Sequence, residues 1–105
     1  MSRRVVLQDA AREDAFHFYQ MIARQNPAAA ERFLDALRET CEFLAEHPRV
    51  GTRRGSTLPQ LSDLRSYGIR GFPNHLILFL PLRDGVIIAR VRHGAEDLRT
   101  WLGEA

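Results

Sequence analysis

The sequence predicts a single α+β domain in which a helical hairpin packs on a small antiparallel sheet, with the element order β-α-α-β-β-β. Apolar residues recur at helical spacing through most of residues 10–46, whereas short strand-like runs follow one another closely between residues 64 and 93. The length of 105 residues suits one domain spanning residues 1–105 and leaves no room for a second domain of normal size.

A short strand and a first helix open the chain. The β-branched run Arg4–Leu7 favours a strand, and Asp9 offers a cap for the helix that follows. This helix is expected from Ala10 to Gln25, where apolar residues are spaced by three or four positions. Its apolar positions are Ala11, Ala15, Phe18, Tyr19, Ile22 and Ala23.

A second helix is expected from Pro27 to Glu46. Asn26 is a good N-cap, and proline is tolerated at the first helical position. Because almost no linker separates the two helices, they must form an antiparallel hairpin. The second helix has a broad apolar face suited to covering a sheet. This face comprises Ala30, Phe33, Leu34, Leu37, Cys41, Leu44 and Ala45.

A loop and three strands complete the fold. Residues 49–63 contain two glycines, one proline and no sustained period, which predicts an exposed and partly ordered loop. The Asp84-Gly85 pair is a strong hairpin signal between the last two strands. The strands are expected at Leu64 to Ile69 or Arg70, His75 to Leu82 and Val86 to His93, and Glu96 to Leu102 can form a short terminal helix.

The middle strand is almost wholly apolar, so we place it at the centre of the sheet. A turn at Gly71–Asn74 precedes it. Because Pro81 has no N–H group for a strand ladder, we expect the middle strand to lose regular pairing around Leu80–Leu82.

Charge and composition limit the classes of function. All fifteen basic residues are arginine, and residues 48–105 hold nine of them against five acidic residues. This excess is the usual sign of an anionic partner, and arginine-favouring codon usage with an ordinary solvated surface is the alternative. No apolar run approaches the length of about 20 residues that crosses a bilayer, so we expect a cytosolic protein with no membrane contact. Cys41, the only cysteine, excludes an internal disulfide and is expected in the core.

Strand alternation predicts an arginine-bearing face on the sheet. In the last strand it directs Ile87, Ala89 and Val91 toward the helices. It would leave the other set, Ile88, Arg90 and Arg92, on the open face.

Guanidinium groups on that face would match phosphates or carboxylates. Arg65 and Arg70 come from the neighbouring segment, and His93 closes the strand. The alternative is that the arginines solvate the sheet and pair with acidic neighbours, for which the candidates are Asp84, Glu96 and Asp97.

The histidines and the missing motifs predict no metal and no cofactor. His17 and His47 have no second ligand three or four residues away. His75 suits a turn, and His93 is the best candidate for chemistry, although a structural role for it is the more common one. No glycine-rich phosphate loop, nucleophile elbow or paired-carboxylate motif is present.

Five segments taken in order carry a family resemblance. They are Ala11–Asp14, Asn26–Phe33, Phe43–Gly51, Leu64–Ser66 and Val86–Leu98, of which the last is the most specific. Together they resemble the ParE/RelE superfamily of toxins from bacterial type II toxin–antitoxin modules, closest to the ParE branch. The resemblance covers nearly the whole chain and implies the element order predicted above.

RelE-like members of the superfamily cut messenger RNA on the ribosome with a cluster of Lys, Arg and Tyr. Arg65 matches an arginine of that cluster, but the chain has no lysine, and Thr100-Trp101 stands where those nucleases place tyrosine. If this protein is a nuclease, the resemblance implies Arg65 and Arg92 on the scissile phosphate and His93 as acid or base. A catalytic role is therefore less expected than a binding one.

The ParE branch is associated with inhibition of DNA gyrase by binding. The target-contacting candidates are then Arg65, Arg70, Arg90, Arg92 and His93. Phe79-Leu80-Pro81 replaces the Phe-Tyr-Arg segment common in the branch, so an inactive remnant that acts only as a binding partner remains an alternative. Direct nucleic-acid binding is left open.

The resemblance also implies a cognate ParD-like antitoxin whose acidic C-terminal segment wraps over the hairpin and the sheet. Basic charge in the second half of the chain would suit such a segment. The residues expected to supply any apolar contact surface outside the core are Phe16, Phe18, Tyr19 and Ile22.

Overall fold

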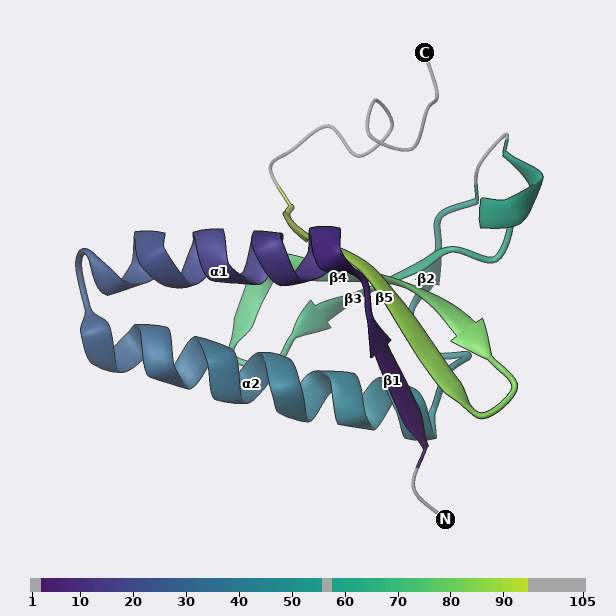
Figure 1. Ribbon diagram of the computed structural model, residues 1–105, viewed down its shortest axis with the longest axis horizontal. Helices are drawn as coiled ribbons and strands as arrows, with labels where there is room; N and C mark the ends of the chain where they lie inside the picture. Colours follow the sequence, from purple (N-terminus) through teal and green to yellow (C-terminus); the bar gives the residue numbers. More distant parts are fainter. Residues whose placement is uncertain (1–2, 56–57, 95–105) are drawn as a thin grey trace.

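The computed structural model describes residues 3–55 and 58–94 and confirms the predicted α+β fold. Two antiparallel helices lie against one face of a five-stranded sheet (Figure 1). The elements are β1 Arg4–Leu7, α1 Asp9–Ala23, α2 Pro27–Glu46, β2 Thr52–Arg53, a 3₁₀ turn Pro59–Leu61, β3 Arg65–Ile69, β4 Phe72–Leu82 and β5 Gly85–His93. The predicted terminal helix over residues 96–102 lies outside the described residues.

The helical hairpin forms nearly as predicted. α2 has the expected bounds, and the Asn26 side chain accepts a hydrogen bond from the Ala29 N–H at 3.0 Å. The prediction of Asp9 as the α1 cap is wrong, because Gln8 occupies the cap position without a side-chain bond. Asp9 instead lies in the first turn, where its negative charge interacts favourably with the positive end of the helix dipole.

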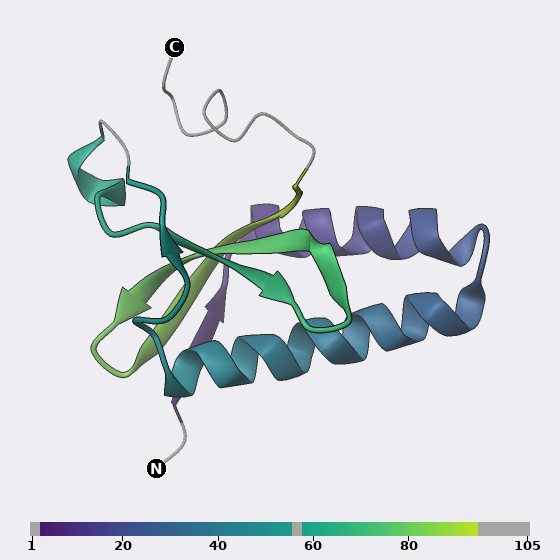
Figure 2. The same ribbon diagram turned by 180° about the vertical axis from the view of Figure 1, so that it is seen from behind.

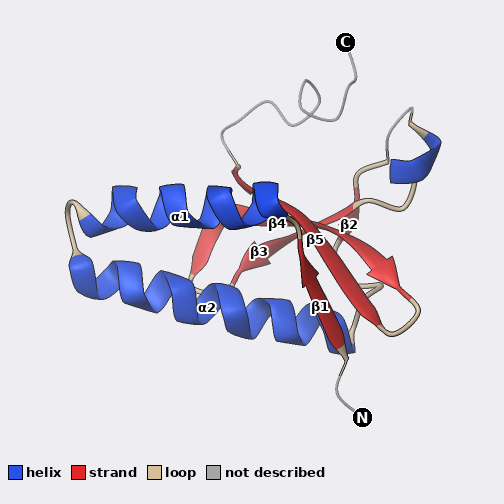
Figure 3. Cartoon of the chain, in the orientation of Figure 1, coloured by secondary structure: helices blue, strands red, loops and turns tan. Residues whose placement is uncertain are grey.

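The sheet is mixed, and its strand order is β1-β5-β4-β3-β2 (Figure 3). β1 pairs parallel to β5, whereas the remaining neighbours pair antiparallel. The Arg4 side chain binds Asp84 at 2.9 Å, and the Arg4 N–H donates to the Asp84 carbonyl at 2.8 Å. These bonds hold the start of β1 against the β4–β5 turn. The short strand β2, which the sequence analysis did not predict, forms the opposite edge.

The loop before β3 covers part of the sheet face that lies away from the helices, the face seen in Figure 2. Leu64 and Leu78 are fully buried there, and Leu61, Leu80 and Ala89 pack against them. Most of the described residues between 49 and 63 are exposed, as expected, but Leu61 near the C-terminal end of this segment packs against the sheet. The far face has a small apolar core of its own.

β4 is longer and more regular at its end than expected. It begins at Phe72, because the tight turn falls at Arg70–Gly71, where Gly71 has φ +83°. Pairing with β5 continues unbroken through Pro81 to Leu82, so the predicted loss of pairing there is wrong. β3 pairs with β4 no further than Phe79, which leaves Pro81 where β3 requires no hydrogen bond from it.

The irregularity in the β4–β5 pair lies closer to the centre. Leu78 pairs with Arg90 and Phe79 pairs with Ile88, so Ala89 is an extra residue in a bulge. The bulge resets the alternation, and Ile88 and Val91 both point into the main core. The prediction that Ile87 and Ala89 face the helices while Ile88 faces away is therefore wrong.

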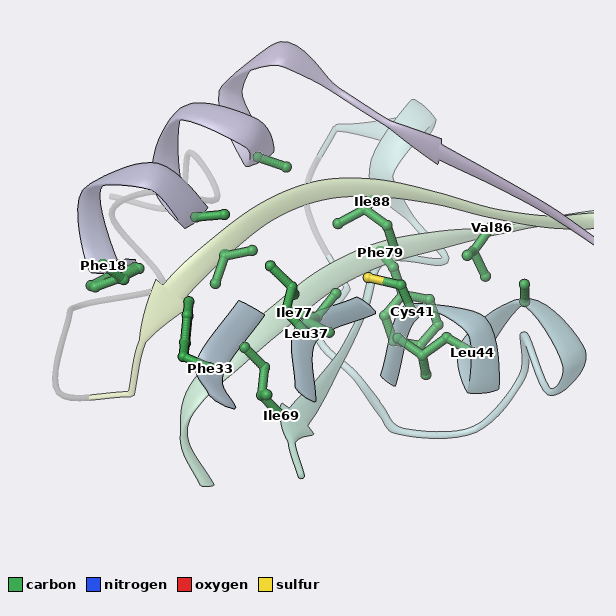
Figure 4. Close-up of a cluster of buried hydrophobic side chains, with 14 residues drawn as sticks. Phe18, Phe33, Leu37, Cys41, Leu44, Ile69, Ile77, Phe79, Val86 and Ile88 are labelled. Carbon is green, nitrogen blue, oxygen red and sulfur yellow. The ribbon is translucent and has the colours of Figure 1, made fainter. Parts of the chain in front are cut away.

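The main core lies between the helices and the sheet (Figure 4). Phe33 and Leu44 from α2 meet Ile77 and Phe79 from β4, and all four are fully buried. Cys41 is also buried, as predicted, and burial raises the pKa of its thiol to about 12. The thiol is therefore a packing group and not a nucleophile.

Gly85 is required where β1 meets β5, because a Cβ atom there would overlap the backbone of Arg4. We expect Gly85→Ala to lower the free energy of unfolding by about 2 kcal/mol through steric crowding. Gly68→Ala is the matched control, since its added Cβ would lie 3.6 Å from the nearest atom. Urea unfolding followed by circular dichroism measures both variants, and equal effects would contradict this account of the parallel pair.

Candidate functional site

The strand register determines which predicted site residues share a face of the sheet. Directly paired residues point to the same side. Arg90 pairs with Leu78 and Arg92 with Leu76, which places both arginines on the far face.

Arg65 and His93 fall on the other face. Arg65 pairs with Phe79 in the main core, and His93 pairs with His75, so both belong to the side that the helices cover. The five predicted target-contacting residues therefore do not form a single surface.

Arg90 and Arg92 converge on Asp14 of α1. The Arg90 Nε and Nη2 groups donate to the two carboxylate oxygens at 2.7 and 2.8 Å, and Arg92 Nη1 lies 3.6 Å from Asp14 Oδ1. The same carboxylate accepts the Val91 N–H at 3.0 Å. Asp14 is only 11% exposed, so this ion pair belongs to the fold rather than to an ordinary solvated surface.

This partner differs from those expected from sequence. Asp84 binds Arg4, a hydrogen bond that lowers the pKa of the Asp84 carboxyl, and Glu96 and Asp97 lie outside the described residues. β1 ends at Leu7, and beyond that point α1 runs past the edge of β5 and supplies Asp14. Asp14 entered the sequence analysis only within a segment that resembles the family, and its pairing with Arg90 was not predicted.

Arg65 is fixed at the start of β3, with a side chain only 12% exposed. Its Nη1 donates to the Arg49 carbonyl at 2.7 Å, and its Nη2 donates to Asp63 Oδ1 at 3.2 Å. Arg49 Nη1 and Arg53 Nε also reach Asp63, at 3.0 and 3.5 Å. Three guanidinium groups thus share one carboxylate, an arrangement that the sequence analysis did not identify.

Arg70 occupies the turn between β3 and β4 and is exposed. Its guanidinium carbon lies 4.3 Å from the centroid of the Phe43 ring on α2. The Arg70 backbone N–H donates to the buried Thr40 hydroxyl at 3.3 Å. The turn is therefore fixed, and the head group lies on an aromatic surface.

His75 and His93 stack edge to face, with ring centroids 5.1 Å apart. His75 also meets the rings of Phe18 and Phe33, at 4.9 and 5.2 Å. Burial, with a smaller contribution from His93, lowers the pKa of His75. Both histidines line a hollow of about 730 Å³ that Met21 on α1 also borders. His93 thus lines an aromatic hollow whose described lining residues do not include Arg65 or Arg92.

A second concave region, which we call the hairpin groove, runs between the helices beside β1. It consists of two adjoining hollows of about 300 and 360 Å³ that share Leu7, Leu34 and Leu37. Phe16, 60% exposed, and Leu34, 37% exposed, leave apolar surface uncovered there. Its charged lining residues are Arg12, Arg38 and Glu42.

The four residues predicted to contact the antitoxin separate between regions. Phe16 and Tyr19 line the hairpin groove, where the Tyr19 hydroxyl lies 2.9 Å from Glu31 Oε1. Phe18 is buried in the main core, and Ile22 borders the histidine hollow. Helical spacing identified this apolar set but did not separate its core-facing members from the groove-facing ones.

Within residues 3–55 and 58–94, no group of three or more His, Cys, Asp or Glu side chains could hold a metal ion. Across the same described ranges, no helix has the length and apolar character of a membrane span.

Comparison with known proteins gives three consistent similarities. A family described as the ParE toxin of type II toxin–antitoxin system, parDE, matches residues 5–98. Toxin RelE3 of Caulobacter vibrioides is 30% identical over 92 residues, which are 88% of this chain and 95% of that protein. A chain of the chromosomal ParDE system from P. aeruginosa aligns with a TM-score of 0.68 at 16% identity, over 88% of this chain and 96% of that one, and shares the fold.

The Asp14 contact predicts a large effect on stability. Asp14→Ala leaves Arg90 half-buried without its bidentate partner, so we expect the free energy of unfolding to fall by about 3 kcal/mol. Asp35→Ala is the control, because Asp35 and Arg38 are 3.7 Å apart and well exposed, and should cost less than about 0.5 kcal/mol. Denaturant unfolding of both variants measures the difference, and a small effect at Asp14 would show that α1 is not anchored there.

Proposed function

Because the chain belongs to the ParE toxin family of type II toxin–antitoxin systems, we propose that it inhibits DNA gyrase by binding and that a cognate ParD-like antitoxin neutralises it. We place this action in the cytoplasm. The proposed target-contacting residues are Arg65, Arg70, Arg90, Arg92 and His93. Arg70 is the exposed member of this set, and Arg65 contributes what its 12% exposed side chain leaves accessible.

The candidate nuclease residues, Arg65, Arg92 and His93, lie apart in the structure, and this observation favours binding over cleavage. Phosphodiester cleavage needs a cation and an acid or base within reach of the same phosphate. Arg92 is on the far face, whereas Arg65 and His93 are on the helix face. Their β4 partners, Phe79 and His75, are four residues apart, or roughly 13 Å along the strand.

A ribosome-dependent endoribonuclease is the second candidate, favoured by the similarity to a protein named Toxin RelE3. An inactive remnant that only binds a partner is the third. Neither alternative changes the proposed antitoxin contact, which rests on a different part of the molecule.

We propose that the antitoxin places an apolar segment in the hairpin groove. The groove is apolar at its floor, through Leu7 and Leu37, and exposes Phe16 and Leu34 at its surface. Two arginines and one glutamate in its lining leave a net positive charge, which suits an acidic segment of the partner.

The target proposal predicts that the purified toxin lowers plasmid supercoiling by gyrase and leaves messenger RNA uncut in a ribosomal translation reaction. Arg70→Ala should weaken the supercoiling effect while antitoxin binding stays unchanged. Arg24→Ala, an exposed change just beyond the C-terminal end of α1, is the matched control. Cleavage of messages within codons on ribosomes would refute the gyrase proposal, and loss of both effects would favour the remnant.

The groove proposal predicts that Phe16→Ser weakens antitoxin binding by about tenfold to a hundredfold, because a large aromatic side chain loses its burial in the complex. Met21→Ser is the control, since Met21 is 48% exposed on the same helix but borders the histidine hollow. Isothermal titration calorimetry against the antitoxin measures both. Equal losses would show that the antitoxin does not distinguish the two hollows.

A further inference from the structure

We propose that the β2 edge of the sheet carries a binding site for the phosphodiester backbone of a nucleic acid. The site, which we call the β2 arginine cluster, is formed by Arg49, Arg53 and Arg54 beside Arg65. It shares Arg65 with the gyrase proposal but concerns direct contact of this chain with nucleic acid, which the gyrase proposal does not require.

The cluster has a large local excess of positive charge. Arg49, Arg53 and Arg65 all reach the single carboxylate of Asp63. Arg54, the next residue along, bonds the neutral Ser66 hydroxyl through its Nε at 2.7 Å. Three guanidinium groups thus share one acidic residue, and Arg54 adds a fourth on the other side of the same strand edge, beside Ser66. The β2 edge therefore carries four positive charges against the one negative charge of Asp63.

The backbone that presents these groups is fixed. Arg53 pairs with Arg65 in the β2–β3 ladder, and the Arg54 N–H donates to the Leu64 carbonyl at 2.8 Å. The Arg49 carbonyl accepts from Arg65 at 2.7 Å. Rigid backbone with exposed head groups lowers the ordering cost of binding an anion.

The head groups themselves are held weakly enough to exchange partners. The side chains of Arg49 and Arg53 are 72% and 64% exposed, and exposed guanidinium–carboxylate pairs stabilise a protein little. The two non-bridging oxygens of a phosphodiester can accept a guanidinium fork as the two oxygens of a carboxylate do. Neutralising a polyanion also releases its condensed counterions, which favours nucleic acid over an isolated carboxylate.

The surroundings favour a nucleic-acid backbone over an acidic protein segment. A protein interface normally contains an apolar core. Exposed large apolar side chains in the described residues lie mainly elsewhere, with Val5 and Leu34 at the hairpin groove, and Leu58 is the exception near the cluster. The strand order places β1 and β2 at opposite edges of the sheet, so the cluster lies away from the groove proposed for the antitoxin.

The test measures fluorescence anisotropy of labelled duplex DNA and of single-stranded RNA at a series of NaCl concentrations. We expect the full-length protein to bind, and Arg49→Gln/Arg53→Gln/Arg54→Gln to weaken binding by about tenfold or more at low salt. At about 0.9 per phosphate contact on a duplex, the slope of log affinity against log salt should fall by roughly two to three. The relative affinities for DNA and RNA show which of the two nucleic acids the cluster prefers.

The matched control is Arg24→Gln/Arg32→Gln/Arg38→Gln, which removes the same charge from exposed positions in the helical hairpin. It should retain most of the affinity and the salt slope, and an equal loss would overturn the proposal. Asp63→Asn keeps an amide oxygen for Arg65 but removes the negative charge, so it should tighten binding several-fold, which a destabilised protein would not do. Polyglutamate that binds as tightly as DNA at equal charge, with the same loss in the triple variant, would assign the cluster to an acidic protein segment instead.

Discussion

The contact between Asp14 and β5 determines how the two layers of this protein fit together. One carboxylate accepts both arms of the Arg90 guanidinium and the Val91 N–H, at a point where β1 has ended and β5 would otherwise present an unpaired edge. The bond fixes α1 against the sheet, and with it the position of α2 in the hairpin. Because Arg90 follows the bulge at Ala89, the same contact depends on the strand register.

Helical periodicity, together with the Asn26-Pro27 cap signal, was sufficient to predict the hairpin, although the cap predicted for α1 was wrong. Pro27 to Glu46 is a helix with the expected cap, and Cys41 and Phe33 lie in the core as the apolar spacing indicates. Apolar and β-branched runs, with the turn signals between them, located the strands to within a few residues. What local pattern could not supply was pairing, since the parallel neighbour of β1 and the two-residue strand β2 form only when distant segments meet.

The candidate site was harder to predict because a single extra residue changes the facing of a strand. Alternation without a bulge places Ile88 beside Arg90 on the far face, whereas the structure buries Ile88 in the main core. Arg90 and Arg92 keep the predicted face but bind Asp14, which is 76 residues from Arg90 in the sequence. Arginine content therefore predicted basic surface without indicating which guanidinium groups the fold itself uses.

The two edges of the sheet carry different kinds of surface. Uncovered apolar surface lies beside β1, where Phe16 and Leu34 meet the hairpin groove, while uncompensated charge lies beside β2 around Asp63. An antitoxin segment held in the groove leaves the β2 arginine cluster uncovered by that contact. If the cluster binds nucleic acid, blocking that binding requires a second, acidic part of the antitoxin that reaches across the sheet to compete for the same guanidinium groups.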